Sequence, residues 1–241
     1  MKQTLSALLL TTLVGCVTVT DGGEPIASAT SIEKAETRVA LGLGYLQQGN
    51  MIKARENLES AMKHAPNYYR TQLSMAHYYD AVGEPQAAKK MYQLAVRQNP
   101  KNGDVLNNYG TFLCKQNEFG QADHYFKQAI KQTTYYRSSD SYENAAFCAL
   151  KAGNDRLAEV YFKRTLDHDP NRTRSLLQLA KLEIERDQFT QARLRLLNFH
   201  QQFGIHQASL SLLIDLESKA GNTVMSERYQ EQLNTLIEQR S

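Results

Sequence analysis

The sequence predicts an all-α protein built as a solenoid of helix pairs, and three observations support this prediction. The 241-residue chain has five prolines and no tryptophan, while Ala, Leu, Gln, Lys and Arg are abundant, a composition typical of helices. Small and apolar residues recur with a period of 34 residues between residues 35 and 240. A residue suited to a left-handed turn, most often glycine, recurs once per period, where two helices must separate. We therefore expect about six antiparallel helix pairs.

The first residues are predicted to be a processing signal. Lys2 precedes an apolar run over residues 5–14, so residues 1–15 have the length and polarity of a secretory signal peptide. The Gly15–Cys16 pair that ends the run resembles a bacterial lipobox, in which a peptidase cuts before a cysteine whose sulfur carries a diacylglycerol. An ordinary signal peptide with a chance cysteine is the alternative. Cys16 is the expected lipidation site.

Residues 16–34 are expected to be the lipidated cysteine and a flexible tether. Residues 17–31 show no helical period and are rich in Thr, Ser, Gly and Ala. A flexible chain of this length places the folded part roughly 20 Å from the lipid. Lipoproteins of this kind that stay on the inner membrane carry Asp after the cysteine, and here Val17 stands there. The resemblance therefore implies a lipid anchor on the periplasmic face of the outer membrane.

The six expected repeats cover residues 35–68, 69–102, 103–136, 139–172, 173–206 and 207–240. Each resembles the tetratricopeptide repeat, which implies a right-handed superhelical solenoid. Counted from the first residue of a repeat, small residues at positions 8 and 20 let the two helices approach, and apolar residues at positions 7, 11 and 24 fill the space between them. Position 11 becomes Glu183 and Glu217 in the last two repeats, and residues 224–239 form an amphipathic helix. We interpret this loss of pattern as a polar cap on the solenoid.

The sequence lacks the patterns of an enzyme, a metal site or a nucleic-acid-binding protein. With 28 basic and 25 acidic residues the net charge is +3, too even for a nucleic-acid footprint. The six histidines show no metal-ligand spacing. Gly42, Gly44 and Gly49 are not followed by the Lys-Ser/Thr of a phosphate loop. A Cys114–His77 nucleophile pair would lack an orienting acid. We expect a non-catalytic protein without a cofactor.

Two cysteines remain beside Cys16. Cys114 occupies position 12 in the first helix of repeat three, and Cys148 occupies position 10 in the first helix of repeat four. Because neighbouring first helices lie side by side, the separation of about 4.4–6.8 Å between Cα atoms that a disulfide needs is attainable. The bacterial periplasm keeps disulfides oxidised. Two buried free thiols are the alternative.

Tetratricopeptide solenoids bind peptides on the concave face, which the first helices line. Repeat one offers an apolar stripe there at spacing i, i+4, i+7, formed by Val39, Leu43 and Leu46. The stripe either binds a partner, packs against Ile26 and Ile32, or fills the interface between repeats. Repeats two and three offer polar candidates instead, for which a solvated face is the alternative. These partner-binding candidates are Arg70, His77, Asn107 and Thr111.

Three segments resemble a particular family of pilus proteins. They are the run Val105–Cys114, the junction Tyr136–Ser139 and the Ala-Glu-Val-Tyr-Phe stretch at 158–162. Together with the lipobox they resemble the PilF/PilW family of type IV pilus biogenesis lipoproteins. The resemblance implies a monomeric, non-catalytic pilotin that binds a PilQ-like secretin subunit and promotes its localisation to the outer membrane and its multimerisation. The alternative is a general periplasmic adaptor lipoprotein that recruits peptidoglycan hydrolases or other envelope proteins.

Overall fold

The structure is a computed structural model that describes residues 30–239. The signal peptide, Cys16, Val17 and most of the expected tether lie outside the described residues. Within residues 30–239 the chain forms twelve α-helices and no strand, which confirms the all-α prediction. The helices are α1 (Ser31–Gln47), α2 (Met51–His64), α3 (Tyr69–Ala81), α4 (Pro85–Gln98), α5 (Gly103–Lys115), α6 (Phe119–Ile130), α7 (Ser138–Lys151), α8 (Asp155–His168), α9 (Thr173–Glu185), α10 (Phe189–Phe203), α11 (Gln207–Lys219) and α12 (Thr223–Glu238).

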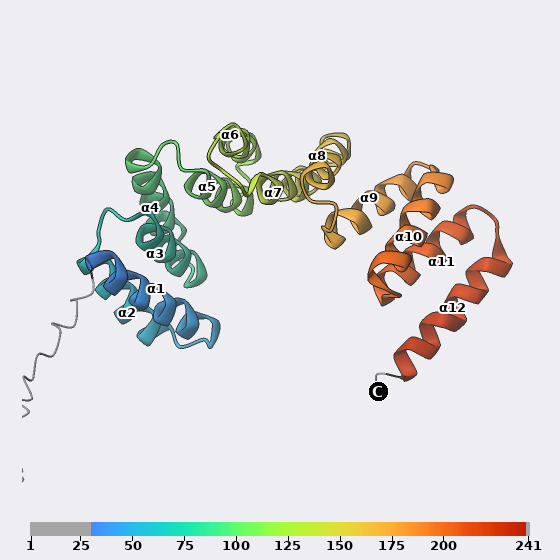
Figure 1. Ribbon diagram of the computed structural model, residues 1–241, viewed down its shortest axis with the longest axis horizontal. Coiled ribbons are helices and arrows are strands. Elements are labelled where there is room, and N and C mark those ends of the chain that lie inside the picture. Colours follow the sequence, from blue (N-terminus) through green and yellow to red (C-terminus); the bar gives the residue numbers. More distant parts are fainter. Residues whose placement is uncertain (1–29, 240–241) are drawn as a thin grey trace, which may run out of the picture.

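The helices follow one another along an open arch (Figure 1). Each odd-numbered helix pairs with the next even-numbered one, and each pair also contacts the pair that follows. In the middle of the arch, α5 and α7 lie toward the hollow, while α6 and α8 lie on the outer side (Figure 1). This is the architecture of a tetratricopeptide solenoid, in which contacts are made mainly between neighbouring repeats.

The first helix begins earlier than the sequence analysis expected. The tether was expected to reach residue 34, but α1 begins at Ser31. The hydroxyl of Thr30 accepts a hydrogen bond from the Glu33 amide (3.2 Å), and the Glu33 carboxylate accepts one from the Thr30 amide (2.6 Å). This reciprocal pair is a capping box, which satisfies two backbone donors at the start of a helix. The Thr-x-x-Glu spacing therefore extends the helix into the expected tether.

The turn within each repeat has the same left-handed backbone even where glycine is absent. Repeats three and five have Asn117 and Asp187 at the turn, with φ of 64° and 58°. Asn and Asp tolerate this conformation better than other side-chain-bearing residues because their short polar groups hydrogen-bond locally. The turn is thus preserved, and the helix pairs keep a common geometry along the solenoid.

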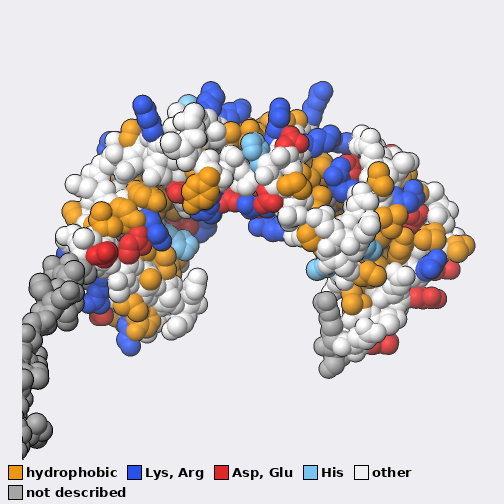
Figure 2. Space-filling view, in the orientation of Figure 1, with side chains coloured by type: hydrophobic (Ala, Val, Ile, Leu, Met, Phe, Trp, Pro, Cys, Tyr) orange, Lys and Arg blue, Asp and Glu red, His pale blue; other side chains and the backbone are white. Residues whose placement is uncertain are grey.

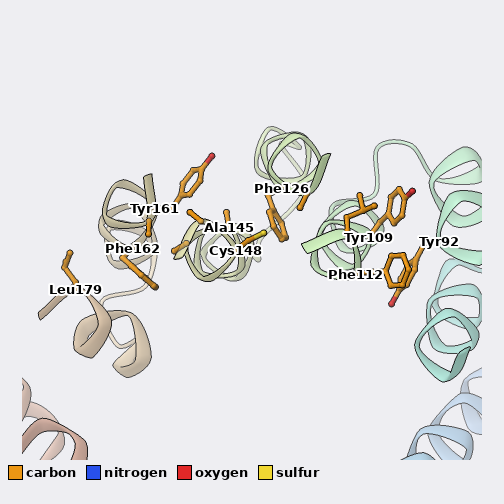
Figure 3. Close-up of a cluster of buried hydrophobic side chains, with 14 of the residues drawn as sticks. Tyr92, Tyr109, Phe112, Phe126, Ala145, Cys148, Tyr161, Phe162 and Leu179 are labelled. Carbon is orange, nitrogen blue, oxygen red and sulfur yellow. The ribbon is translucent and has the colours of Figure 1, made fainter. Parts of the chain in front are cut away.

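Large apolar side chains at equivalent repeat positions build the core (Figure 3). Phe126 and Phe162, both at position 24, are fully buried between the helices of repeats three and four. Tyr92 lies with its ring centroid 5.8 Å from that of Tyr109 and 5.0 Å from that of Phe112, which joins repeat two to repeat three. Such aromatic contacts contribute beyond the area that they bury.

The two glutamates at position 11 do not belong to a polar cap. The Glu217 side chain is only 1% exposed, and both of its carboxylate oxygens accept hydrogen bonds from Arg193 at 2.6 and 2.8 Å. Glu183 makes the same two-bond pair with Arg195, at 2.7 and 3.0 Å. At position 11 the last two repeats therefore have buried carboxylates paired with arginines, beside an apolar core that they keep.

Candidate partner-binding surface

The inner side of the arch is a concave surface (Figure 2). Figure 2 shows acidic and basic side chains gathered along its inner edge. Many of these charges are paired with each other across neighbouring repeats. Lys115 Nζ lies 2.9 Å from an Asp80 oxygen, and Arg137 Nη1 lies 3.3 Å from an Asp104 oxygen. These ion pairs therefore connect helices of neighbouring repeats, and they also make the concave surface charged.

A groove of about 480 Å³ opens on this face across the first helices of repeats one, two and three and the connection before repeat four. Its lining combines an apolar floor with a polar and aromatic rim. The lining residues are Val39, Leu43, Tyr69, Arg70, Leu73, Ser74, Asp104, Asn108, Tyr136 and Arg137. We name this feature the N-terminal groove.

The predicted apolar stripe is divided between the core and the N-terminal groove. Val39 is 2% exposed and packs in a core cluster with Met75 and Tyr78, so it mainly fills the interface between repeats. Leu43 is half-buried and lines the groove, whereas Leu46 is half-buried outside the lining. Ile32 is half exposed and is not part of this cluster. Leu43 is therefore the member of the stripe best placed to meet a partner.

Arg70 stands at the rim of the groove, as the sequence analysis expected for a concave position. Its Nη1 lies 3.1 Å from a Glu36 oxygen, and the same oxygen accepts a hydrogen bond from the Tyr68 hydroxyl. Burial, together with the neighbouring carboxylate, raises the pKa of Tyr68 to about 12. The phenol therefore stays protonated and keeps Glu36, and through it Arg70, in place.

The remaining polar candidates do not line the groove. His77 and Thr111 are exposed elsewhere, and the Thr111 hydroxyl donates to the Asn107 carbonyl (3.0 Å). Asn107 is buried, and its side-chain oxygen accepts hydrogen bonds from Ser141 (3.0 Å) and Asn144 (3.1 Å). The expectation that Asn107 faces a partner is wrong, because α7 uses its amide oxygen to dock on α5.

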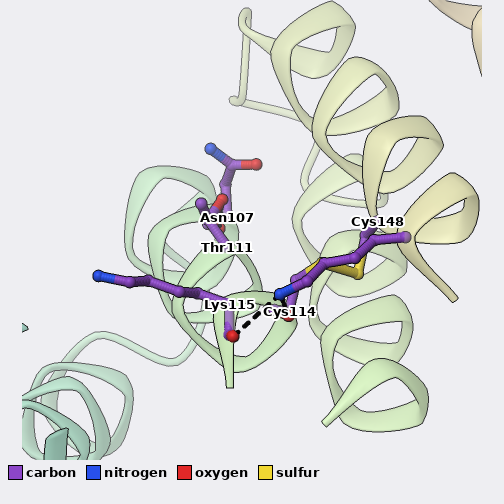
Figure 4. The surroundings of a disulfide bond; sticks show 6 residues. Asn107, Thr111, Cys114, Lys115 and Cys148 are labelled. Carbon is purple, nitrogen blue, oxygen red and sulfur yellow. Dashed lines mark hydrogen bonds between the residues drawn. A yellow bond between two sulfur atoms is a disulfide. The ribbon is translucent and has the colours of Figure 1, made fainter. Parts of the chain in front are cut away.

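A disulfide joins the same two helices. Cys114 and Cys148 are bonded, with their Cα atoms 5.8 Å apart. Lys151 Nζ donates to the backbone carbonyls of Cys114 (3.2 Å) and Lys115 (3.0 Å) beside it (Figure 4). A covalent bond and a charge-assisted pair of hydrogen bonds therefore connect repeat three to repeat four at the middle of the arch.

The sequence analysis missed several residues of the groove. Leu73 occupies position 5, a concave position, so the rule that selected Leu43 in repeat one also points to it. Tyr69 opens α3, one residue before a concave position. Tyr136 was noticed only as part of a family motif. It lies in the irregular connection before repeat four, where periodic counting assigns no face.

Other kinds of site are not found in the described part of the chain. Residues 30–239 contain no group of three or more His, Cys, Asp or Glu side chains arranged to hold a metal ion. Among the same residues no helix combines the length and apolarity that crossing a membrane requires.

Comparison with known proteins places this architecture in a family. Two tetratricopeptide-repeat models match residues 69–102 and 91–124. The type IV pilus assembly protein PilF of Pseudomonas aeruginosa is 30% identical over 215 residues, which is 89% of this chain and 85% of that protein. An uncharacterized protein of Haemophilus influenzae is 45% identical over 118 residues, which is 49% of this chain and 66% of that protein.

Solved structures agree with the sequence comparison. The structure described as a functional characterization of Pseudomonas aeruginosa pilF has a TM-score of 0.73 and 29% identity, covering 86% of this chain and 93% of its own. The crystal structure of PilW, described as a widely conserved type IV pilus biogenesis factor, has a TM-score of 0.72 over 83% of this chain and 92% of its own. At 24% identity PilW supports the fold alone.

The fold and the groove define a tetratricopeptide-repeat protein with an open concave surface. Within that class the chain belongs to the PilF/PilW-like family of type IV pilus biogenesis proteins, as its identity to PilF over nine tenths of its length shows.

Proposed function

We propose that this protein is a pilotin for type IV pilus biogenesis. In this proposal Cys16 carries a lipid that anchors the chain to the inner leaflet of the outer membrane. The solenoid binds the secretin subunit without catalysis and promotes its localisation and multimerisation there. The observation that carries the proposal is the N-terminal groove, which offers an apolar floor and a polar rim in a family of pilus assembly proteins.

In this proposal, membrane anchoring and partner recognition belong to different parts of the chain. A groove with a few apolar side chains and flanking polar groups suits an extended polypeptide, because apolar anchors supply affinity and polar rims fix orientation. A lipid anchor confines the complex to the membrane surface and raises the effective concentration of bound subunits there. The two parts together favour assembly of a ring at the outer membrane.

Leu43→Glu tests the groove. A carboxylate in the apolar floor would be desolvated by a bound partner, so we expect binding to the purified periplasmic domain of the secretin subunit to weaken at least about tenfold. Leu41→Glu is the matched control, because Leu41 lies in the same helix, is 45% exposed and does not line the groove. If the wild-type protein and Leu43→Glu bind the secretin domain with equal affinity, the proposed contact at Leu43 is wrong.

The cellular role needs a separate experiment. Outer-membrane fractions from strains with and without the gene are run unheated on a denaturing gel and probed for the secretin multimer. We expect the multimer to vanish without the gene and to return with the wild-type copy but not with Cys16→Ala. An unchanged multimer in the deletion strain would reject the pilotin function and favour the adaptor that recruits peptidoglycan hydrolases.

A further inference from the structure

The connection between α6 and α7 is longer than its counterparts. It runs over residues 131–137, whereas the equivalent connections run over residues 65–68, 99–102 and 169–172. The extra length brings Tyr136 to the edge of the N-terminal groove, where its side chain is 88% exposed. Tyr136 is therefore accessible to a partner that enters the groove.

The residue before Tyr136 is fixed inside the protein. A Cβ at Gly103 would lie 2.2 Å from Cγ of Tyr135, so the absence of a side chain at Gly103 makes room for this ring. The Tyr135 hydroxyl lies 3.2 Å from the Ser141 hydroxyl, within hydrogen-bond distance, and burial raises the pKa of Tyr135. Tyr135 is therefore an inward anchor for the connection.

The residue after Tyr136 is fixed as well. Arg137 places Nη2 2.6 Å from an oxygen of Asp140 and Nη1 3.3 Å from an oxygen of Asp104. One of these carboxylates belongs to α5 and the other to α7, so the guanidinium ties the connection to both helices. Both neighbours of Tyr136 therefore contact the helices, while Tyr136 itself is exposed.

The charges of the groove indicate the kind of segment that it accepts. Two guanidinium groups, Arg70 and Arg137, and one carboxylate, Asp104, line it. Arg70 is half exposed, and within residues 30–239 Glu36 is the one carboxylate paired with it, so several of its five donors remain for a ligand. Arg137 is already paired with Asp104 and Asp140, so Arg70 is the guanidinium of the groove with donors to offer. A ligand with an acidic residue beside Arg70 and an apolar residue nearby complements this surface.

We propose that Tyr136 is a partner-contact residue that closes the N-terminal groove. The occupant is an extended segment of the partner with a bulky apolar side chain over Leu43 and Leu73 and an acidic residue beside Arg70. This proposal rests on the proposed function, because it concerns the same groove. What the proposal adds is a role for the irregular connection between α6 and α7, which holds the Tyr136 side chain opposite the apolar floor of the groove. Tyrosine in such a place contributes contact area at a low cost in conformational entropy.

Substitution at Tyr136 tests the contact. We expect Tyr136→Ala to weaken binding of the secretin periplasmic domain to the full-length protein about tenfold, and Tyr136→Phe to stay within about twofold of wild type. Ile52→Ala is the control, because Ile52 is 75% exposed on α2 and does not line the groove. If Leu43→Glu abolishes binding while Tyr136→Ala matches the wild type, the role of Tyr136 is overturned and the proposed function stands. If the wild-type protein does not bind, both fall.

A spectroscopic measurement reports the contact without relying on affinity. The chain contains no tryptophan, so Tyr136→Trp and Ile52→Trp each introduce a single site for 5-fluorotryptophan. We expect the fluorine resonance at residue 136 to shift or broaden when the unlabelled secretin domain is added, and the resonance at residue 52 to remain unchanged. Equal responses at both sites, or none at residue 136 under saturating partner, would contradict the contact.

The dependence of binding on salt concentration tests whether the bound segment places an acidic residue beside Arg70. Charge pairs that are accessible to solvent weaken with ionic strength. We expect binding by the wild-type protein to weaken as sodium chloride is added, and binding by Arg70→Gln to start weaker and to respond less. Equal salt responses of the two proteins would overturn the assignment of an acidic residue beside Arg70.

Discussion

At the scale of the residue, the neighbours of a polar side chain decide what it does. Glu217 occupies a position that is apolar in the first four repeats, yet it is buried and held by two hydrogen bonds from Arg193. A buried carboxylate is stable when a cation and hydrogen bonds satisfy its oxygens. Asn107 illustrates the same rule on the concave face, where its amide oxygen is used by the next repeat.

His200 predicts a pH dependence of stability in the C-terminal repeats. Burial, assisted by nearby His206, lowers the pKa of His200 below its ordinary value of 6.5. The unfolded chain then binds more protons than the native one in this range, so stability is complete above about pH 6.5 and is lost as the pH falls toward the native pKa. Urea unfolding at about pH 7.5 and 5.5 measures this loss. We expect His200→Gln to lose less stability between these values than the wild type, and equal losses would contradict the prediction.

At the scale of the element, close approach of two helices depends on single small residues. A Cβ at Gly42 would lie 2.6 Å from Cγ of the fully buried Leu58 and 3.3 Å from the carbonyl oxygen of Ala54. The helix α1 therefore needs glycine at position 8 to pack on α2. Gly44, two residues further along the same helix, has no atom within 4 Å of an added Cβ.

This contrast gives a matched pair of substitutions within one helix. Gly42→Ala should lower the free energy of unfolding by about 1–3 kcal/mol, because overpacking displaces Leu58. Gly44→Ala should raise it by about 0.5–1 kcal/mol, because alanine favours a helix interior and meets no obstacle. Chemical denaturation followed by circular dichroism measures both. A stabilising Gly42→Ala would show that α1 and α2 can separate without cost.

At the scale of the whole molecule, the solenoid depends on contacts between successive repeats. The Cys114–Cys148 disulfide closes a loop between residues 34 apart and joins the two central repeats. Its loss should lower the free energy of unfolding by about 3–4 kcal/mol in the chain-entropy account. We expect Cys148→Ser and the double variant Cys114→Ser/Cys148→Ser to be destabilised equally in denaturant titrations. Thiol titration of the unfolded, unreduced wild type provides the control, since two reactive thiols from these cysteines would refute the bond.

The repeat architecture of this protein can be predicted from its residue pattern alone. Helix pairing can be predicted from a few positions in each repeat, namely position 8, position 24 and the turn residue. Close approach of two helices and a left-handed turn each require particular residue types wherever they occur. Periodicity therefore predicted the all-α solenoid from the composition and spacing of residues such as Gly42, Phe126 and Asn117. It also selected Leu43 and Arg70 for the concave face.

The residue pattern does not predict which concave residues are available to a partner, because this depends on contacts between repeats. Val39 and Asn107 share the concave pattern, but one is used by the core and the other by α7. Tyr136 follows no pattern, because it lies in an irregular connection whose path is fixed by Tyr135 and Arg137. The physical reason is that the availability of a side chain to a partner depends on contacts between residues about 34 positions apart. The repeat period predicts which face of the solenoid a residue lies on, but not whether a neighbouring repeat already contacts its side chain.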